Sequence, residues 1–365
     1  MARLLPILLV LPLAAAQPAR FEEHTIATGL RGGYQVVAVD LNHDGKPDLI
    51  ALASGLPELV WFENPGWERH VIAGGQSRMI NCVAVPAAGD AVPEIVLASE
   101  FSNNAKQSAG VVRVLHHNGD PRQPWSTREI DRLPASHRLR LLRIDGETVV
   151  VNAPLTAADA EPPDYRGHTP LVYYRPGEWK RRLLSDENQG LVHGILIDGA
   201  DVLTAGFEGI FRFHRAAGRW TRTEIARGDP APWPKSGSSD IALGRLGGES
   251  FLAAIEPWHG NQVAVYRSGR TVIDDSLADG HTILAADFNG DGADEIVAGF
   301  RGVPHSVYVY YFDAGKWNRT VLDNGGMAAA ACAAADLDAD GRPDIVCIGT
   351  ATQNLKWYRN LPPRP

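Results

Sequence analysis

The sequence predicts an all-β protein, a seven-bladed β-propeller, and three observations lead to that prediction. An acidic, glycine-containing loop between two apolar runs occurs three times, and a strand motif that starts with tryptophan occurs five times. The spacing of these markers is close to the length of a propeller blade. No segment shows the apolar period of a helix. With 365 residues and 44% hydrophobic side chains, the chain can bury the core of such a fold.

The first marker is a pair of short apolar runs joined by an acidic loop. Its copies are Val36 to Leu52, Ile283 to Gly299 and Cys332 to Gly349. The second marker is a tryptophan followed by basic and β-branched residues, and it occurs at Trp67, Trp125, Trp179, Trp220 and Trp317. Segments of alternating polarity between the markers are typical of strands. We expect the repeated tryptophans to pack between neighbouring blades.

Taking each unit as four strands gives seven units. Their first strands are predicted to begin, roughly 42 to 59 residues apart, near Tyr34, Met79, Arg138, Leu191, Asp240, Thr282 and Ala329. The third unit contains an insertion, Leu155 to Pro170, which is long enough to be a functional loop.

The two ends of the mature chain are predicted to share one blade. The last unit has only three strands and lacks the tryptophan-type fourth strand, and the segment Phe21 to Ala27 resembles the missing strand. Pairing there closes the ring and leaves no long exposed sheet edge.

The N-terminus has the order of a secretory signal peptide. Arg3 precedes an apolar run from Leu4 to Leu13, and Ala14 to Ala16 then offer a cleavage site. A buried N-terminal strand or helix is the alternative. We therefore predict a signal peptide at residues 1–16 and a single propeller domain at residues 17–365. The protein is expected to be exported to the periplasm or the cell exterior, and no later stretch predicts a membrane span.

Charge and cysteine content narrow the possible partners and stabilising groups. The formal charge is -8, which argues against nucleic acid as a partner. The three cysteines are too few for a disulfide framework, although Cys332 and Cys347 flank one predicted hairpin and are a candidate pair. The odd count leaves a free thiol, which we expect to pack as a small hydrophobe.

The acidic loops have the spacing of calcium sites. Oxygen ligands at alternating positions wrap a hard cation, and a glycine at position 6 permits the sharp turn. No glutamate stands at position 12 and strands flank each loop, so an EF-hand is rejected; an ion-free Asx-turn is the alternative. Three structural Ca²⁺ ions are therefore expected, with ligands Asp40, Asn42, Asp44 and Asp48; Asp287, Asn289, Asp291 and Glu295; and Asp336, Asp338, Asp340 and Asp344.

The acidic repeats, with Asp-Leu-Ile, Glu-Ile-Val or Asp-Ile-Val after each loop, resemble the FG-GAP/VCBS repeat family. That resemblance covers the mature chain and implies a calcium-studded β-propeller, in a family that includes ligand-binding, adhesive, lectin-like and lyase members. Two shorter stretches, Trp61 to Trp67 and Glu256 to Asn261, resemble the propeller domain of the aldos-2-ulose dehydratase family. This second resemblance implies chemistry on keto-sugars such as anhydrofructose, with a metal in the propeller cavity.

A second site is predicted where the innermost strands begin, on the face opposite the acidic loops. Three histidines from different blades, His137, His193 and His281, stand at these strand starts. Converging imidazoles can bind Zn²⁺ or another divalent metal with an open coordination position. Solvent-rim or hydrogen-bonded histidines are the alternative, because one slipped register turns a side chain away.

The connections on this face supply candidate catalytic groups. His259 or Tyr165 can act as the base that removes a proton next to a sugar carbonyl, and Glu256 can assist loss of the β-hydroxyl. Arg301 can hold substrate oxygens or offset developing negative charge. Glu256 can equally belong to a structural turn, and Tyr165 to an ordered surface loop.

These features favour a metal-assisted carbohydrate lyase or dehydratase that works by β-elimination. The main alternative is a non-catalytic propeller that binds carbohydrate or protein, and a glycosidase is a third. No glycine-rich nucleotide loop, G-x-S-x-G elbow or His-Glu-x-x-His motif occurs in the chain. The expected partner is a carbohydrate or small sugar, with a protein partner also open.

Overall fold

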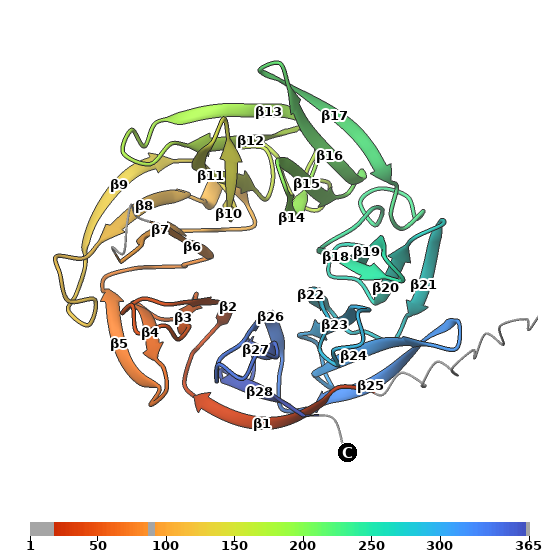
Figure 1. Ribbon diagram of the computed structural model, residues 1–365. Helices are drawn as coiled ribbons and strands as arrows, with labels where there is room; N and C mark the ends of the chain where they lie inside the picture. Colours follow the sequence, from red (N-terminus) through yellow and green to blue (C-terminus); the bar gives the residue numbers. More distant parts are fainter. Residues whose placement is uncertain (1–17, 87–91, 363–365) are drawn as a thin grey trace, which may run out of the picture.

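The computed structural model describes residues 18–86 and 92–362, which form one ring of β-sheets (Figure 1). The predicted signal peptide lies outside the described residues. Within them there is no α-helix, and a single short 3₁₀ helix, η1, covers Ala105–Gln107. None of the described residues belong to a helix that is long and apolar enough to cross a membrane.

The ring consists of seven four-stranded sheets, which confirms the predicted propeller (Figure 1). Blade 1 consists of β2 (Gly33–Val39), β3 (Asp48–Ala53), β4 (Leu59–Glu63) and β5 (Glu68–Ala73), and blade 2 of β6 (Asn81–Val85), β7 (Glu94–Ser99), β8 (Val111–His116) and β9 (Ser126–Arg132). Blade 3 consists of β10 (Ser136–Ile144), β11 (Glu147–Pro154), β12 (His168–Tyr174) and β13 (Arg181–Gln189), and blade 4 of β14 (Val192–Asp198), β15 (Asp201–Gly206), β16 (Gly209–Ala216) and β17 (Arg219–Ala226). Blade 5 consists of β18 (Ile241–Leu246), β19 (Glu249–Glu256), β20 (Gln262–Tyr266) and β21 (Arg270–Asp274), and blade 6 of β22 (Gly280–Ala286), β23 (Glu295–Phe300), β24 (Ser306–Asp313) and β25 (Lys316–Asn324). Blade 7 consists of β26 (Ala329–Ala335), β27 (Asp344–Gly349), β28 (Leu355–Leu361) and β1 (Arg20–Ala27).

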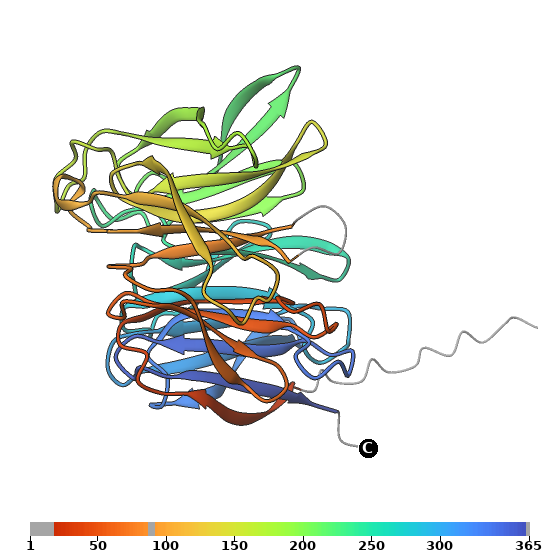
Figure 2. The ribbon, with the colours of Figure 1, turned by 90° about the vertical axis from the view of Figure 1, so that its left-hand side faces the viewer.

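Blade 7 is closed by the N-terminal strand, as the sequence predicted. β1 pairs antiparallel with β28, from Arg20 opposite Leu361 to Ala27 opposite Leu355. The two strands lie side by side in both ribbon views, red against blue (Figures 1 and 2). All other blades run in chain order from an inner to an outer strand.

The second strand of a blade is buried on both faces because apolar blades cover it from each side. Every residue of β3, β23 and β27 is buried, whereas the fourth strands keep exposed polar positions. Trp125 is 5% exposed and packs in the cluster that joins blades 1 and 2, as expected for the repeated tryptophans.

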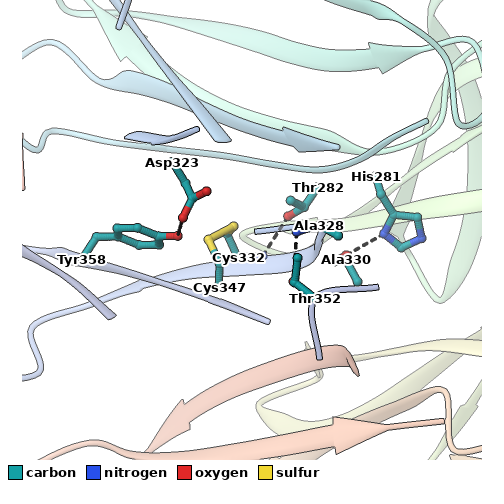
Figure 3. Close-up of a disulfide and its surroundings, with 9 residues drawn as sticks. All are labelled: His281, Thr282, Asp323, Ala328, Ala330, Cys332, Cys347, Thr352 and Tyr358. Atoms are coloured by element: carbon teal, nitrogen blue, oxygen red, sulfur yellow. Dashed lines mark hydrogen bonds between the residues drawn. A yellow bond between two sulfur atoms is a disulfide. The ribbon is translucent and has the colours of Figure 1, made fainter. Parts of the chain in front are cut away.

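One disulfide lies in the described residues, between Cys332 on β26 and Cys347 on β27 (Figure 3). The candidate pairing is therefore confirmed, and Cys82 is a buried free thiol. The backbone N–H of Cys332 donates to Thr282 Oγ1 of the neighbouring blade at 3.0 Å (Figure 3). A side chain on one inner strand thus supplies a hydrogen-bond partner for a backbone group at the inner edge of the next blade.

An acid–tyrosine–base bridge fastens several blades together. Asp274 ends the outer strand of blade 5 and accepts hydrogen bonds from Tyr310 Oη at 2.8 Å and Arg319 at 2.7 Å, both of blade 6. Two other interfaces repeat the arrangement: Asp131 with Tyr174 and Arg181, and Asp323 with Tyr358 and Lys356. Because the carboxylates and tyrosines of these bridges are largely buried, their pairing holds neighbouring blades in register.

We expect Asp274→Asn to destabilise the protein in a pH-dependent way. Burial of the carboxyl raises its pKa, but hydrogen bonds from Ser276, Tyr310 and Arg319 outweigh that effect and hold the pKa of Asp274 below its usual value. The stabilisation is therefore present above the unfolded-state pKa of about 3.9 and is lost as the pH falls through the folded-state pKa. Thermal unfolding at pH 7 should show a loss of about 2 kcal/mol.

The difference between wild type and Asp274→Asn should shrink as the pH falls through the lowered folded-state pKa of Asp274. The matched control is Asp275→Asn, at the exposed neighbouring residue, which should leave the melting temperature unchanged. An equal loss for both variants, or a constant difference at every pH, would contradict the role assigned to the bridge.

Candidate metal and sugar site at the propeller axis

A β-bulge near the start of the inner strand directs one side chain per blade toward the axis. In five blades the ladder skips the second strand residue, so that it has no partner on the next strand. The skipped residues are Tyr34, His137, His193, His281 and Ala330. A bulge re-aims a side chain without ending the strand, and the rings of the first four meet although they come from different blades.

Three histidines form a group that can hold a metal ion: His193, His259 and His281. One ring nitrogen of each lies within 4.8 Å of the others. His193 Nε2 and His259 Nε2 are 3.3 Å apart. Two nitrogens bound to one tetrahedral Zn²⁺ at 2.0–2.1 Å are separated by about 3.3–3.4 Å, so this pair has the spacing of metal ligands.

His281 presents a free lone pair to this group. Its Nδ1 lies 2.5 Å from the carbonyl oxygen of Ala330, and a carbonyl can only accept, so Nδ1 carries the proton (Figure 3). Its buried Nε2 has no hydrogen-bond partner among the described residues. On His193, Nδ1 lies 3.2 Å from Ser239 Oγ, which leaves Nε2 facing His259.

His259 reaches the axis from the connection between β19 and β20. Its φ is +50°, and its backbone N–H donates to Ser239 Oγ at 3.4 Å. Its Nδ1 lies 3.3 Å from Asp279 Oδ1 and 3.0 Å from a nitrogen of Arg301, which itself makes two hydrogen bonds to Asp279. Nε2 carries the proton in the tautomer that accepts from Arg301, and is free for a metal in the tautomer whose Nδ1–H donates to Asp279. A carboxylate behind an imidazole is the usual means of orienting a metal-bound histidine.

The histidines of this centre are neutral at ordinary pH. Burial, followed by the charges of nearby arginines, holds the pKa of His193 and His281 well below the usual value. The same causes, burial and then Arg301 and Arg138, lower the pKa of His259 to about 3. Neutral imidazole is the form that binds metals, so the site is prepared for a cation.

The structure changes the roles predicted for two histidines. His137 is not in the metal-capable group: its Nε2 lies 2.8 Å from the Tyr34 hydroxyl and its ring packs against Phe101. His259, predicted as a base, takes the third ligand position because the loop after β19 turns it toward His193. Burial, with Arg138 adding to the effect, holds the pKa of His137 well below the usual value, so His137 is a neutral imidazole hydrogen-bonded to Tyr34.

Two of the predicted catalytic residues do not contact this centre. Glu256 is fully buried, and its carboxylate is held by Tyr266 and Arg270 on the neighbouring strands β20 and β21. Glu256 is therefore a structural residue, which corrects its predicted role as an acid. Tyr165, from the predicted insertion, is 4% exposed and packs edge-on against Trp258, which covers His259 at 4.6 Å between ring centroids. Tyr165 therefore packs behind Trp258 and His259 as part of the wall around the histidine group.

A cavity of about 360 Å³ occupies the centre of the ring, lined by residues of all seven inner strands and by Asp240 just before β18. Tyr34, Arg138 and Arg140 face it, and Arg138 also lies 3.5 Å from His193 Nε2. Sequence reasoning did not assign Tyr34 a role. Its place in the repeat, equivalent to that of the three inner-strand histidines, is the signal that could have identified it.

The three acidic loops share one geometry at the opposite face. The N–H of the position-6 glycine donates to the position-1 aspartate in each loop, as Gly45 does to Asp40 at 3.0 Å. The position-9 acids accept the N–H of position 2: Leu41 to Asp48, Phe288 to Glu295 and Leu337 to Asp344. Burial, with nearby carboxylates adding to the effect, raises the pKa of Asp48 to about 6 and that of Glu295 to about 8.

Two loops hold carboxylate oxygens suited to a cation. Asp40 Oδ1 and Asp338 Oδ1 are buried and have no hydrogen-bond donor among the described residues. Asp336, Asp338 and Asp340 also bring ligand oxygens within 4.8 Å of one another. Unpaired acceptors of this kind fit a hard cation such as Ca²⁺.

Comparisons with known proteins match separate parts of the chain to three family models. Residues 32–61 match the FG-GAP repeat, and residues 287–347 match the FG-GAP-like repeat. The chain carries FG-GAP repeats. Residues 109–269 of this FG-GAP propeller match the β-propeller domain of aldos-2-ulose dehydratase. That segment contains His137, His193 and His259, whereas Tyr34 and His281 lie outside it.

One curated relative is aldos-2-ulose dehydratase of Phanerodontia chrysosporium. The two sequences are 26% identical over 239 residues, which cover 53% of this chain and 26% of the relative. The FG-GAP propeller thus matches about a quarter of that enzyme's length.

Solved structures show the same fold at low sequence identity. An ancestral GH74 enzyme aligns with a TM-score of 0.58 and 10% identity, over 94% of this chain and 48% of that one. The extracellular domain of a putative hybrid two-component system from B. thetaiotaomicron gives 0.59 and 11%, over 95% and 40%. BBS1N in complex with ARL6DN gives 0.56 and 12%, over 94% and 97%. These likenesses concern the fold alone.

Proposed function

We propose that this FG-GAP propeller is an exported, metal-assisted carbohydrate lyase of the dehydratase type, acting by β-elimination on a keto-sugar or related sugar. The observation that supports this most is the group of three neutral imidazoles at the axis, with one nitrogen of each within 4.8 Å of the others. The match to the propeller of a sugar dehydratase includes two of these residues, His193 and His259.

His193, His259 and His281 would hold the divalent metal, which supplies a Lewis acid that polarises a carbonyl oxygen of the sugar. Asp279 orients His259, and the Ala330 carbonyl orients His281. Arg138, beside His193, offsets the negative charge that develops on the sugar oxygen when the neighbouring C–H is deprotonated.

Proton transfer falls to Tyr34 and His137. The Tyr34 hydroxyl faces the cavity and is hydrogen-bonded to the neutral His137, so the tyrosine oxygen can take the proton from carbon in the same step in which its own proton passes to His137. The proton removed from carbon then returns to the departing β-hydroxyl, which leaves as water. The substrate loses one water, and no nucleotide cofactor is required.

The metal role is tested with His281→Ala, which removes a ligand whose buried nitrogen has no other partner among the described residues. We expect purified untagged protein to contain about one Zn²⁺, Mn²⁺ or Fe²⁺ per chain beyond calcium, and the variant to lose it. Elimination from anhydrofructose, followed by ultraviolet absorbance of the unsaturated product, should fall about 100-fold or more.

The matched control is His116→Ala, at an exposed histidine on β8, which should keep both metal and turnover. Unchanged elimination by His281→Ala would refute the metal role. A protein that binds the metal and sugars without any turnover would refute catalysis and identify a carbohydrate-binding propeller.

We also propose that the acidic loops bind structural Ca²⁺, on the strength of the unpaired Asp40 and Asp338 oxygens. Removing Ca²⁺ with a chelator should lower the melting temperature by roughly 5 °C, because an ion that binds only the folded state stabilises it. Asp338→Asn should reduce that shift. Asp145→Asn, in the blade 3 hairpin that lacks the other ligands, should leave it intact; equal effects of the two variants would contradict the assignment.

A further inference from the structure

The central cavity holds an excess of positive charge. Arg138 and Arg140, both on β10, line it together with Asp240, the one carboxylate in its wall among the described residues. Arg138 is 6% exposed, and its contacts are His193 at 3.5 Å and the Tyr34 ring, whose centroid lies 5.4 Å away. Arg140 donates to the carbonyl of Leu139 at 2.9 Å.

Neither guanidinium forms an ion pair in the part of the chain that the structure describes, where no carboxylate oxygen approaches either within 4.0 Å. Two partly buried arginines elsewhere in the fold are paired, Arg222 with Glu208 and Arg301 with Asp279. A buried charge without a partner is costly in free energy. Its presence at a cavity therefore indicates a ligand of opposite charge that pairs with it.

Arg140 keeps its charge at neutral pH. Burial, and then the neighbouring Arg138, lower the pKa of Arg140 to about 10. Asp240 cannot balance two cations: burial raises its pKa, and the two arginines act against that rise. The cavity therefore has a net charge of about +1 or more before any ligand enters.

We propose that this cavity binds an anionic group and that the substrate of the axial centre is a sugar carrying a carboxylate, a hexuronate or its keto derivative. The volume of about 360 Å³ is at the lower end of the range for small-ligand sites, which suits a single sugar ring. Planar guanidinium groups match a carboxylate with paired hydrogen bonds.

The position of Arg138 connects the anion to the reactive centre. Its guanidinium lines the cavity together with Tyr34, 5.4 Å from the Tyr34 ring centroid and 3.5 Å from His193 Nε2, so a carboxylate bound there is next to the proton-transfer pair. Neutralising a carboxylate makes the adjacent C–H easier to deprotonate, which is the bond that an elimination must break. The assignment of the bound sugar as a substrate rests on the proposed function, whereas binding of the anion can be measured without turnover.

The test is calorimetric titration of the whole purified protein with D-glucuronate, D-glucose, acetate and sulfate at low salt. D-Glucuronate should bind and D-glucose should bind at least about tenfold more weakly, because only the first carries the charge. Arg140→Gln should weaken D-glucuronate binding about tenfold or more. Arg143→Gln is the matched control, on the same strand but exposed and bonded to the Gly146 carbonyl, and should bind as the wild type does.

Equal affinity for glucuronate and glucose, or equal behaviour of the two arginine variants, would overturn the proposal. Acetate or sulfate binding as tightly as glucuronate would overturn the acidic-sugar assignment and leave a site for inorganic or simple anions only. Glucuronate binding that depends on Arg140, without elimination from any sugar, would uphold the anion site and refute the lyase. Circular dichroism of each variant separates these outcomes from misfolding.

Discussion

The bulge near the start of the inner strands determines which side chains occupy the propeller axis. A regular ladder would place consecutive residues on alternate sides of the blade, against one neighbour or the other. The extra residue breaks that alternation once, at Tyr34, His137, His193, His281 and Ala330. Two members of the imidazole group, His193 and His281, and the tyrosine–histidine pair depend on this one irregularity.

Such an axis is unfavourable for folding when considered by itself. Four imidazoles lie against one another close to two guanidiniums, and burial deprives them of solvation. The periphery offsets this cost with closed sheets, fully buried second strands and acid–tyrosine–base bridges such as that of Asp274. The stability of the outer ring thus offsets the free-energy cost of burying these polar groups at the axis.

The fold could be predicted from sequence because its markers are local and repeated. Acidic loops with fixed spacing and tryptophan-led outer strands give the blade length, and the unpaired last unit predicts closure by the N-terminal strand. The axial histidines at strand starts were likewise found by their repeat position.

The place of His259 in the imidazole group could not be predicted, because it depends on the path of a loop. That loop turns so tightly that a Cβ on Gly260 would lie 2.2 Å from the Glu256 carbonyl oxygen. Glu256, only three residues earlier, is directed instead toward Arg270 and Tyr266. Arg138 and Arg140 gave no signal because a charged residue inside a strand looks the same in sequence whether it faces solvent or an internal cavity.

The pairing of β1 with β28 makes assembly of the ring dependent on both ends of the chain. β1 finds its partner only after β28 has been synthesised, across the longest sequence separation between paired strands in the described residues. Six blades can therefore form in order as the chain emerges, whereas the seventh waits for the final residues. A chain truncated before β28 would keep an open sheet edge on blade 7, which is a template for pairing with other chains. Only a chain that contains both β1 and β28 can therefore close the ring.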